Sequence, residues 1–268
     1  VQLDITGPLL DATDLYERSG GIISLRFWRE IRRLVDQTAD TIGDPDHGIW
    51  EPRSEPQHHV HSKLMAWVAL DRALQLAPLF GGDEHQERWR AAREEVRQDI
   101  LERGFNSKLG SFVNAYGSKD VDAALLLFPI YGFLPPNHRC VTGTLDRVIR
   151  DLSDGRYIRR YRGDDGIGAD EGGFLLCGFW LAEALALAGR VDEALEVMSQ
   201  HVGAANHVGL LAEEVDPVTG TELGNFPQAF SHLGLIQAAT RIDLAIRMRD
   251  EGSERAPRHT FDLPVRGS

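Results

Sequence analysis

The stretch DEGGFLLCGFWLAEALALAGRVDEA, residues 170–194, decides the fold. Between Phe174 and Ala188 nearly every residue is apolar, and Glu183 is the one charge. Gly189 then marks a short turn, after which a second helical pattern begins. We predict a helix over 171–188 and another over 190–203. A helix that is apolar nearly all round is buried, so further helices must surround the first one.

Outward from this hairpin, the helical period dominates the chain and the alternation typical of strands is almost absent. Segment 24–43 is a clear case, because Ser24 can cap it and its apolar residues fall on one stripe opposite charged ones. The fold class is therefore all-α. The predicted helices span 7–18, 24–43, 61–80, 84–103, 120–130, 141–152, 171–188, 190–203 and 226–247.

The connections between these helices alternate between short and long. Four of them, 44–60, 104–119, 153–170 and 204–225, have about 16–22 residues, against the usual ~2–8 between helices. In up-and-down helical hairpins, alternate connections lie at the same end of the helices. We therefore expect the four long loops on one face, where they would form a binding or catalytic site. The alternative is that they only cover the surface.

Composition limits the partners. The chain has 268 residues and a net charge of −12, which argues against nucleic acid and anionic membranes, because both need a basic face. The two cysteines, Cys140 and Cys177, sit among apolar residues and imply no disulfide framework, which fits the cytoplasm. No apolar stretch is long enough for a transmembrane helix. The polar residues from Gly252 onward read as a loosely attached tail.

Two of the long loops carry candidate catalytic carboxylates. Glu51 stands between Trp50 and Pro52, on backbone that the proline keeps out of the α region. An aromatic neighbour can desolvate such a carboxyl and raise its pKa, as a general acid requires. A solvated Glu51, or an ion pair with Arg53, is the ordinary alternative.

The second candidate is Glu213, which follows the apolar run Leu210–Ala212 and precedes a turn signal. Glu214 beside it is the competitor. Two carboxylates on neighbouring loops are the minimum for glycoside hydrolysis, with one as acid and one as base or nucleophile. The arginines of 151–165 could bind sugar hydroxyls or simply form salt bridges. Trp50, Tyr161 and Phe230 could stack on a sugar or pack in the core.

The histidines His58, His59 and His61 match no zinc spacing, and we predict no metal and no cofactor.

Four blocks together resemble a known family: HGIWEPRSEPQHHVHSKLMAWVALDRA (47–73), YIRRYRGDDG (157–166), residues 170–194 and GLLAEEVDPVTGTELGNFPQAFSH (209–232). They are similar to the bacterial branch of the glucoamylase/trehalase family, glycoside hydrolase family fifteen. That resemblance implies an (α/α)6 barrel of six helical hairpins and an inverting mechanism with two glutamates and no metal.

The resemblance also implies residue roles. Glu51 matches the family's general acid, and Glu213 matches its general base. The residues that would bind the sugar are Trp50, Arg160, Glu214, Phe230 and Glu171. Phe230 departs from the family pattern, since fungal relatives carry a tryptophan there.

The family barrel has twelve helices, whereas nine are predicted here. The opening residues resemble the start of the fourth helix, so we expect a partial catalytic domain over 1–250 that lacks its first three helices, followed by a tail over 251–268. Its partners would be an oligosaccharide or disaccharide substrate and the missing N-terminal segment of the same protein. No prediction of oligomeric state follows.

The leading functional hypothesis is an inverting, exo-acting, glucoamylase-like α-glucoside hydrolase. The alternatives are a trehalase of the same family and a non-catalytic sugar-binding or scaffold fragment. Inversion predicts carboxyl groups ~6.5–9.5 Å apart, with a water molecule between sugar and base. We also expect Glu51 to be more desolvated than Glu213, because the acid must keep its proton near neutral pH.

Overall fold

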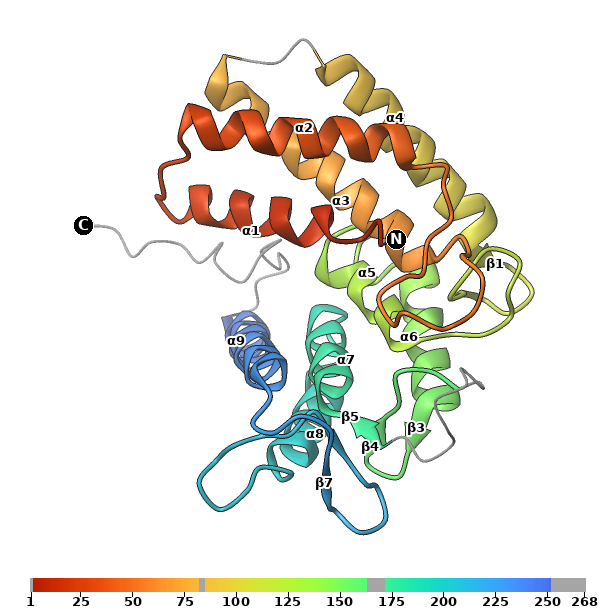
Figure 1. The fold of residues 1–268 in the computed structure, drawn as a ribbon. Coiled ribbons are helices and arrows are strands. Elements are labelled where there is room, and N and C mark those ends of the chain that lie inside the picture. The colour runs from red at the N-terminus through yellow and green to blue at the C-terminus, as the bar shows by residue number, and fades with distance from the viewer. Residues whose placement is uncertain (1, 82–84, 163–171, 252–268) are drawn as a thin grey trace. The chain divides into compact units, whose positions relative to one another are not determined.

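The computed structural model describes residues 2–81, 85–162 and 172–251 (Figure 1). Within these ranges it is an all-α structure with nine α-helices. They are α1 (Thr6–Arg18), α2 (Leu25–Thr41), α3 (Val60–Leu76), α4 (Gln86–Asp99), α5 (Leu127–Ile130), α6 (Arg139–Leu152), α7 (Leu175–Leu187), α8 (Val191–Val202) and α9 (Ala229–Glu251). Each predicted helix has an observed counterpart.

The chain divides into two compact units. Unit 1 comprises residues 1–109 with 113–119, and unit 2 comprises 110–112 with 120–268. The single catalytic domain over 1–250 stays a prediction. The predicted tail, apart from Glu251 at the end of α9, lies outside the described residues.

Unit 1 is built around α3, which packs against α1, α2 and α4. Helix α3 is buried along most of its length, as a central helix must be. Ser24 caps α2 as predicted, and its side chain accepts the Phe27 N–H at 3.2 Å. Trp28 of α2 lies in the core, with its ring stacked on Phe80 at a centroid distance of 4.7 Å.

Unit 2 is built around α7, which packs against α8 and α9. The side chains of α7 are mostly buried and are apolar apart from Glu183, as residues 170–194 predict. His201 of α8 is fully buried against this helix, and a Cβ at Gly178 would lie 1.8 Å from its ring Nε2. Cys177 of α7 and Cys140 of α6 are buried thiols, and burial raises the pKa of both.

Several helix ends differ from the sequence prediction, through strand pairing in one case and 3₁₀ turns in two others. The predicted helix over 171–188 begins only at Leu175, because Gly173 and Phe174 form strand β5 (Gly173–Phe174). The helix over 61–80 ends as a 3₁₀ turn, η1 (Ala77–Phe80), after α3. The helix over 120–130 is a 3₁₀ turn, η3 (Ala123–Leu126), that continues into α5.

The strands are all two residues long, which is too short for alternation to show in the sequence. Besides β5 they are β1 (Phe105–Asn106), β2 (Ser111–Phe112), β3 (Ser153–Asp154), β4 (Tyr157–Ile158), β6 (Glu214–Val215) and β7 (Glu222–Leu223). In unit 2, β5, β6 and β7 form one antiparallel sheet, with Phe174 opposite Glu214 and Glu214 opposite Leu223.

No helix in the described part of the chain is both long and apolar enough to cross a membrane.

Candidate active site

Long loops do come together within each unit. In unit 1, the loop before α3 pairs with residues 113–116: the Val60 N–H donates to the Asn114 carbonyl at 2.9 Å, and the Tyr116 N–H to the His58 carbonyl at 3.0 Å. In unit 2, β5, β6 and β7 bring residues 173–174 and 214–223 into one sheet, and β4 lies beside β5. That all four long loops share one face stays a prediction.

Glu51 lies in unit 1 on unusual backbone. Its φ is 48°, and among the described residues no other non-glycine residue has a positive φ. Such a conformation costs free energy and persists only where the surroundings enforce it, which is common at functional sites. Glu51 is exposed, and no ion pair joins it to Arg53. The half-buried Trp50 precedes it.

Two buried side chains of α3 hold the start of this loop. The Lys63 ammonium donates to the carbonyls of Ile42 and Asp44, both at 2.6 Å, and the Ser62 hydroxyl donates to Asp46 Oδ2 at 2.8 Å. Lys63 is 2% exposed, and burial lowers the pKa of its amine. The sequence analysis assigned neither residue a role at the site.

Glu213 lies in unit 2, immediately before β6, and its carboxylate is fixed by its partners. Oε2 accepts the Asn225 backbone N–H and the Asn225 side-chain amide, both at 2.9 Å. The Glu213 N–H in turn donates to the Asn225 carbonyl at 2.9 Å. No described residue donates to Oε1, which can therefore face a water molecule, as a general base requires.

Gly224 makes this arrangement possible. Its φ is +71°, and a Cβ there would lie 2.6 Å from Glu213 Oε2. Any larger residue would displace the carboxylate. Neither Gly224 nor Asn225 was identified from the sequence, although the Leu-Gly-Asn turn signal was visible.

Glu214 has a different environment. Its Oε2 accepts the Gly172 N–H at 2.9 Å. Burial raises the pKa of the Glu214 carboxyl, and the Gly172 N–H and the nearby charge of Arg160 oppose that rise. A raised pKa disfavours Glu214 as a base, because a base must be ionised at the working pH.

Arg160 lies against two aromatic rings. Its guanidinium lies 5.2 Å from the Phe174 ring centroid and 5.3 Å from that of Tyr161. By contrast, Arg159 pairs with Asp154, and Arg162 donates to the backbone carbonyls of residues 151 and 153. Salt bridges and backbone contacts thus account for these two.

The remaining site residues have mixed outcomes. Phe230 at the start of α9 is 64% exposed, so it is not a core residue. Glu171 lies outside the described residues. The expected order of desolvation is wrong: Glu51 is exposed, whereas Glu213 is half-buried. Trp50 precedes Glu51 without burying it.

The histidines before α3 have structural surroundings. The His58 ring stacks on Tyr116, and the His59 ring lies against Gly48. His61 is 4% exposed, and burial lowers the pKa of its ring to about 4, so it is neutral at pH 7.

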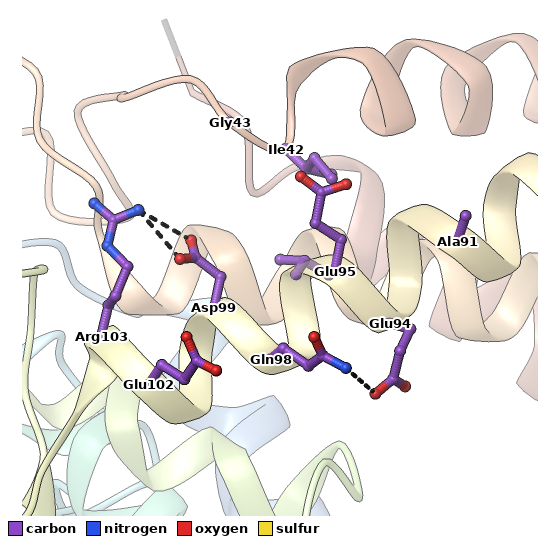
Figure 2. A pocket seen from close by; sticks show the side chains of 10 residues that line it. Ile42, Gly43, Ala91, Glu94, Glu95, Gln98, Asp99, Glu102 and Arg103 are labelled. Carbon is purple, nitrogen blue, oxygen red and sulfur yellow. Dashed lines mark hydrogen bonds and ion pairs between the residues drawn. The ribbon is translucent and has the colours of Figure 1, made fainter.

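A separate hollow of about 580 Å³ lies along α4 in unit 1 (Figure 2). Four of its ten lining residues are acidic, namely Glu94, Glu95, Asp99 and Glu102. Figure 2 shows Asp99 joined to Arg103, whose Nη1 lies 3.1 Å from Asp99 Oδ1. None of the candidate site residues lines this hollow.

The family described as "Glycosyl hydrolases family 15" matches residues 1–240. The chain belongs to this family.

Several curated family relatives are named trehalase. The chain is 40% identical to that of Thermoplasma volcanium over 250 residues, which is 93% of this chain and 40% of the relative. It is also 40% identical to that of Mycobacterium tuberculosis over 253 residues, 93% of this chain and 37% of the relative. The chain therefore spans about two fifths of the length of these relatives.

Solved structures show the same fold. A structure described as a wild-type glycosidase has a TM-score of 0.77 at 23% identity and covers 91% of this chain and 67% of its own. A bacterial glucoamylase in complex with acarbose has a TM-score of 0.70 at 18% identity, covering 91% and 41%. The predicted all-α fold of the (α/α)6 glycosidases is thus confirmed, with family 15 as its family.

Proposed function

We propose that this chain is the catalytic part of an inverting trehalase. The observation that carries the proposal is its 40% identity to proteins named trehalase, over 93% of its length. From the sequence alone, glucoamylase-like activity is the leading hypothesis and trehalase is the alternative. These relatives favour trehalase. Substrate binding falls to Trp50, Arg160, Glu214, Phe230 and Glu171.

In the proposed reaction, Glu51 donates its proton to the oxygen between the two glucose units. Glu213 takes a proton from a water molecule, which attacks C1 from the opposite face of the ring. The attacked glucose leaves as the β-anomer, and the other leaves as the α-anomer. The fixed Oε2 of Glu213 and its open Oε1 support the base role. The positive φ of Glu51 supports a functional role for that residue.

A glucoamylase-like specificity remains the second candidate. The TM-score of 0.70 to the acarbose-bound bacterial glucoamylase shows only a shared fold at 18% identity. Specificity therefore has to be measured.

The test is a chimaera in which this chain replaces the matching 250 residues of the Thermoplasma volcanium trehalase. Trehalose, maltose and isomaltose are each supplied, and NMR follows the anomers of the glucose released. We expect preference for trehalose, with α- and β-glucose formed in equal amounts at early times. Initial release of α-glucose alone would show retention and overturn the mechanism. Preference for maltose would instead establish glucoamylase-like specificity.

We expect the 268-residue chain by itself to hydrolyse all three sugars poorly or not at all. A chimaera that binds trehalose without cleaving it would instead support a sugar-binding module.

A further inference from the structure

The loop that carries Glu51 is closed at its base by Asp46. The Asp46 N–H donates to the Gln57 carbonyl at 2.9 Å, and the Gln57 N–H donates to the Asp46 carbonyl at 2.8 Å. The two residues form an antiparallel bridge. Everything between them, including Trp50 and Glu51, projects from this closed base.

The side chain of Asp46 joins that base to two other parts of unit 1. Its Oδ2 accepts the Leu3 N–H of the N-terminal segment at 3.0 Å and the Ser62 hydroxyl of α3 at 2.8 Å. The neighbouring Gln2 side chain donates to the Gly48 carbonyl at 3.2 Å. Asp46 is 1% exposed, and Ser62 is equally buried, so the hydrogen bond between them is shielded from water, whereas Leu3 is half-buried.

These contacts are important because Glu51 has a backbone conformation that a glutamate rarely adopts without support from the surrounding structure. A positive φ at a glutamate is held only by surrounding structure. Several of the hydrogen bonds that hold this loop lie at or near its base: the bridge, the two bonds to Asp46 Oδ2 and the Gln2 contact, beside those of Lys63 to the carbonyls of Ile42 and Asp44. Displacing a catalytic group by about 1 Å can cost ~10²-fold in rate.

We infer that Asp46 is a positioning residue for the acid. One of its carboxylate oxygens, Oδ2, accepts both hydrogen bonds and so fixes the loop that orients Glu51. This inference rests on the proposed function of Glu51. Because both donors meet one oxygen, an amide carbonyl in the same place can accept both. Asp46→Asn should therefore retain the geometry, whereas Asp46→Ala should lose it.

The first test measures kcat and KM for trehalose in the chimaera. We expect Asp46→Ala to lower kcat about 10²-fold with KM nearly unchanged, and Asp46→Asn to recover most of that loss. The matched control is Asp14→Ala, since Asp14 is also buried, at 3% exposed, and is paired with Arg18 on α1. It should lower stability and leave the kcat of the folded protein unchanged.

The second test uses hydrogen exchange in the 268-residue chain and needs no activity. Asp46→Ala should speed exchange of the Leu3 and Gln57 amides about tenfold or more, and Asp46→Asn should not. If Asp46→Ala does not fold, Ser62→Ala removes one of the two donors and should give a smaller change in the same direction.

The outcomes separate the two proposals. If Glu51→Gln is fully active, the proposed function of Glu51 fails, whatever the exchange data show. If Glu51→Gln is inactive but Asp46→Ala keeps its kcat, only the positioning role fails. An Asp46→Asn variant as impaired as Asp46→Ala would also overturn it.

Discussion

Glu51 and Glu213 are held in opposite ways. The Glu213 carboxylate is gripped directly, by two N–H groups of Asn225 on one oxygen. The Glu51 side chain is exposed, and what is constrained is its backbone, with a φ of 48° above a base closed by Asp46 and Gln57. One group is thus oriented through its side chain and the other through its loop.

The difference fits the two proposed roles. A base must stay ionised, and hydrogen bonds to its carboxylate favour the charged form. An acid must carry a proton, so N–H donors around it would be a disadvantage. Fixing the loop and leaving the carboxyl without such donors avoids that conflict.

The largest expected effect is the loss of either carboxyl. In the chimaera, Glu51→Gln and Glu213→Gln should each lower kcat for trehalose about 10²–10⁴-fold or more, because each removes one half of the acid–base pair. Initial rates with trehalose measure this. A variant that keeps more than a tenth of the activity would remove that residue from the pair.

Replacing one glycine near each carboxylate tests the two ways in which Glu51 and Glu213 are held. Gly224→Ala places a Cβ 2.6 Å from Glu213 Oε2 and should lower kcat about 10²-fold. Gly48→Ala places one 2.8 Å from the His59 ring, at a position with φ +61° inside the Glu51 loop, so it should lower stability as well as kcat. Steady-state kinetics and thermal unfolding of both variants test this. A Gly48→Ala variant that loses kcat with no loss of stability would contradict the contrast.

A smaller effect should follow from Asn225→Ala, which removes the side-chain donor and leaves the backbone donor. We expect kcat to fall about tenfold, because Glu213 Oε2 keeps only one of its two donors and is less firmly oriented. An unchanged kcat would show that the backbone N–H alone orients the carboxylate.

The smallest expected effect is on the pH dependence of the free energy of unfolding, and it involves one buried histidine in each unit. Burial lowers the pKa of His61 in unit 1 and of His201 in unit 2 to about 4. Between pH 6.5 and 4 the unfolded chain binds protons that these rings do not, so the free energy of unfolding falls as pH falls, by about 3 kcal/mol per ring at most. The raised pKa of Asp4 acts in the opposite sense at the acidic end.

Urea unfolding between pH 7 and pH 4 measures this loss. His201→Asn keeps a donor near the position of Nδ1, which bonds the Val197 carbonyl at 2.8 Å, and has no ring to protonate. Its stability should depend less on pH than that of the parent chain. An identical pH dependence would show that His201 is not responsible.

Much of the fold follows from patterns that lie close together in sequence. Ser24 caps α2, and α7 is apolar all round, so both helices could be predicted locally. What was missed depends on contacts between distant residues. Asp46 Oδ2 accepts hydrogen bonds from Leu3 and Ser62, which are distant in sequence. Helix α7 begins only at Leu175 because the two residues before it pair with the distant strand β6.

The site shows the same limit. Motifs suffice to propose Glu51, Glu213 and Arg160 as site residues, but the backbone angle of Glu51 and the hydrogen bonds of Asn225 to Glu213 have no local signal. Desolvation of Glu51 was predicted from its neighbour Trp50. Adjacent residues need not cover one another, and here the carboxyl is exposed.

The two buried thiols of unit 2 can report how often the structure around them opens. Cys140 is 6% exposed and Cys177 is fully buried, and these are the two cysteines of the sequence. Because the thiolate is the reactive form and burial raises both pKa values, a thiol reagent should modify them only when the structure around them opens. The rate of labelling therefore reports how often α6 and α7 open, with no change to the chain and no signal from unit 1.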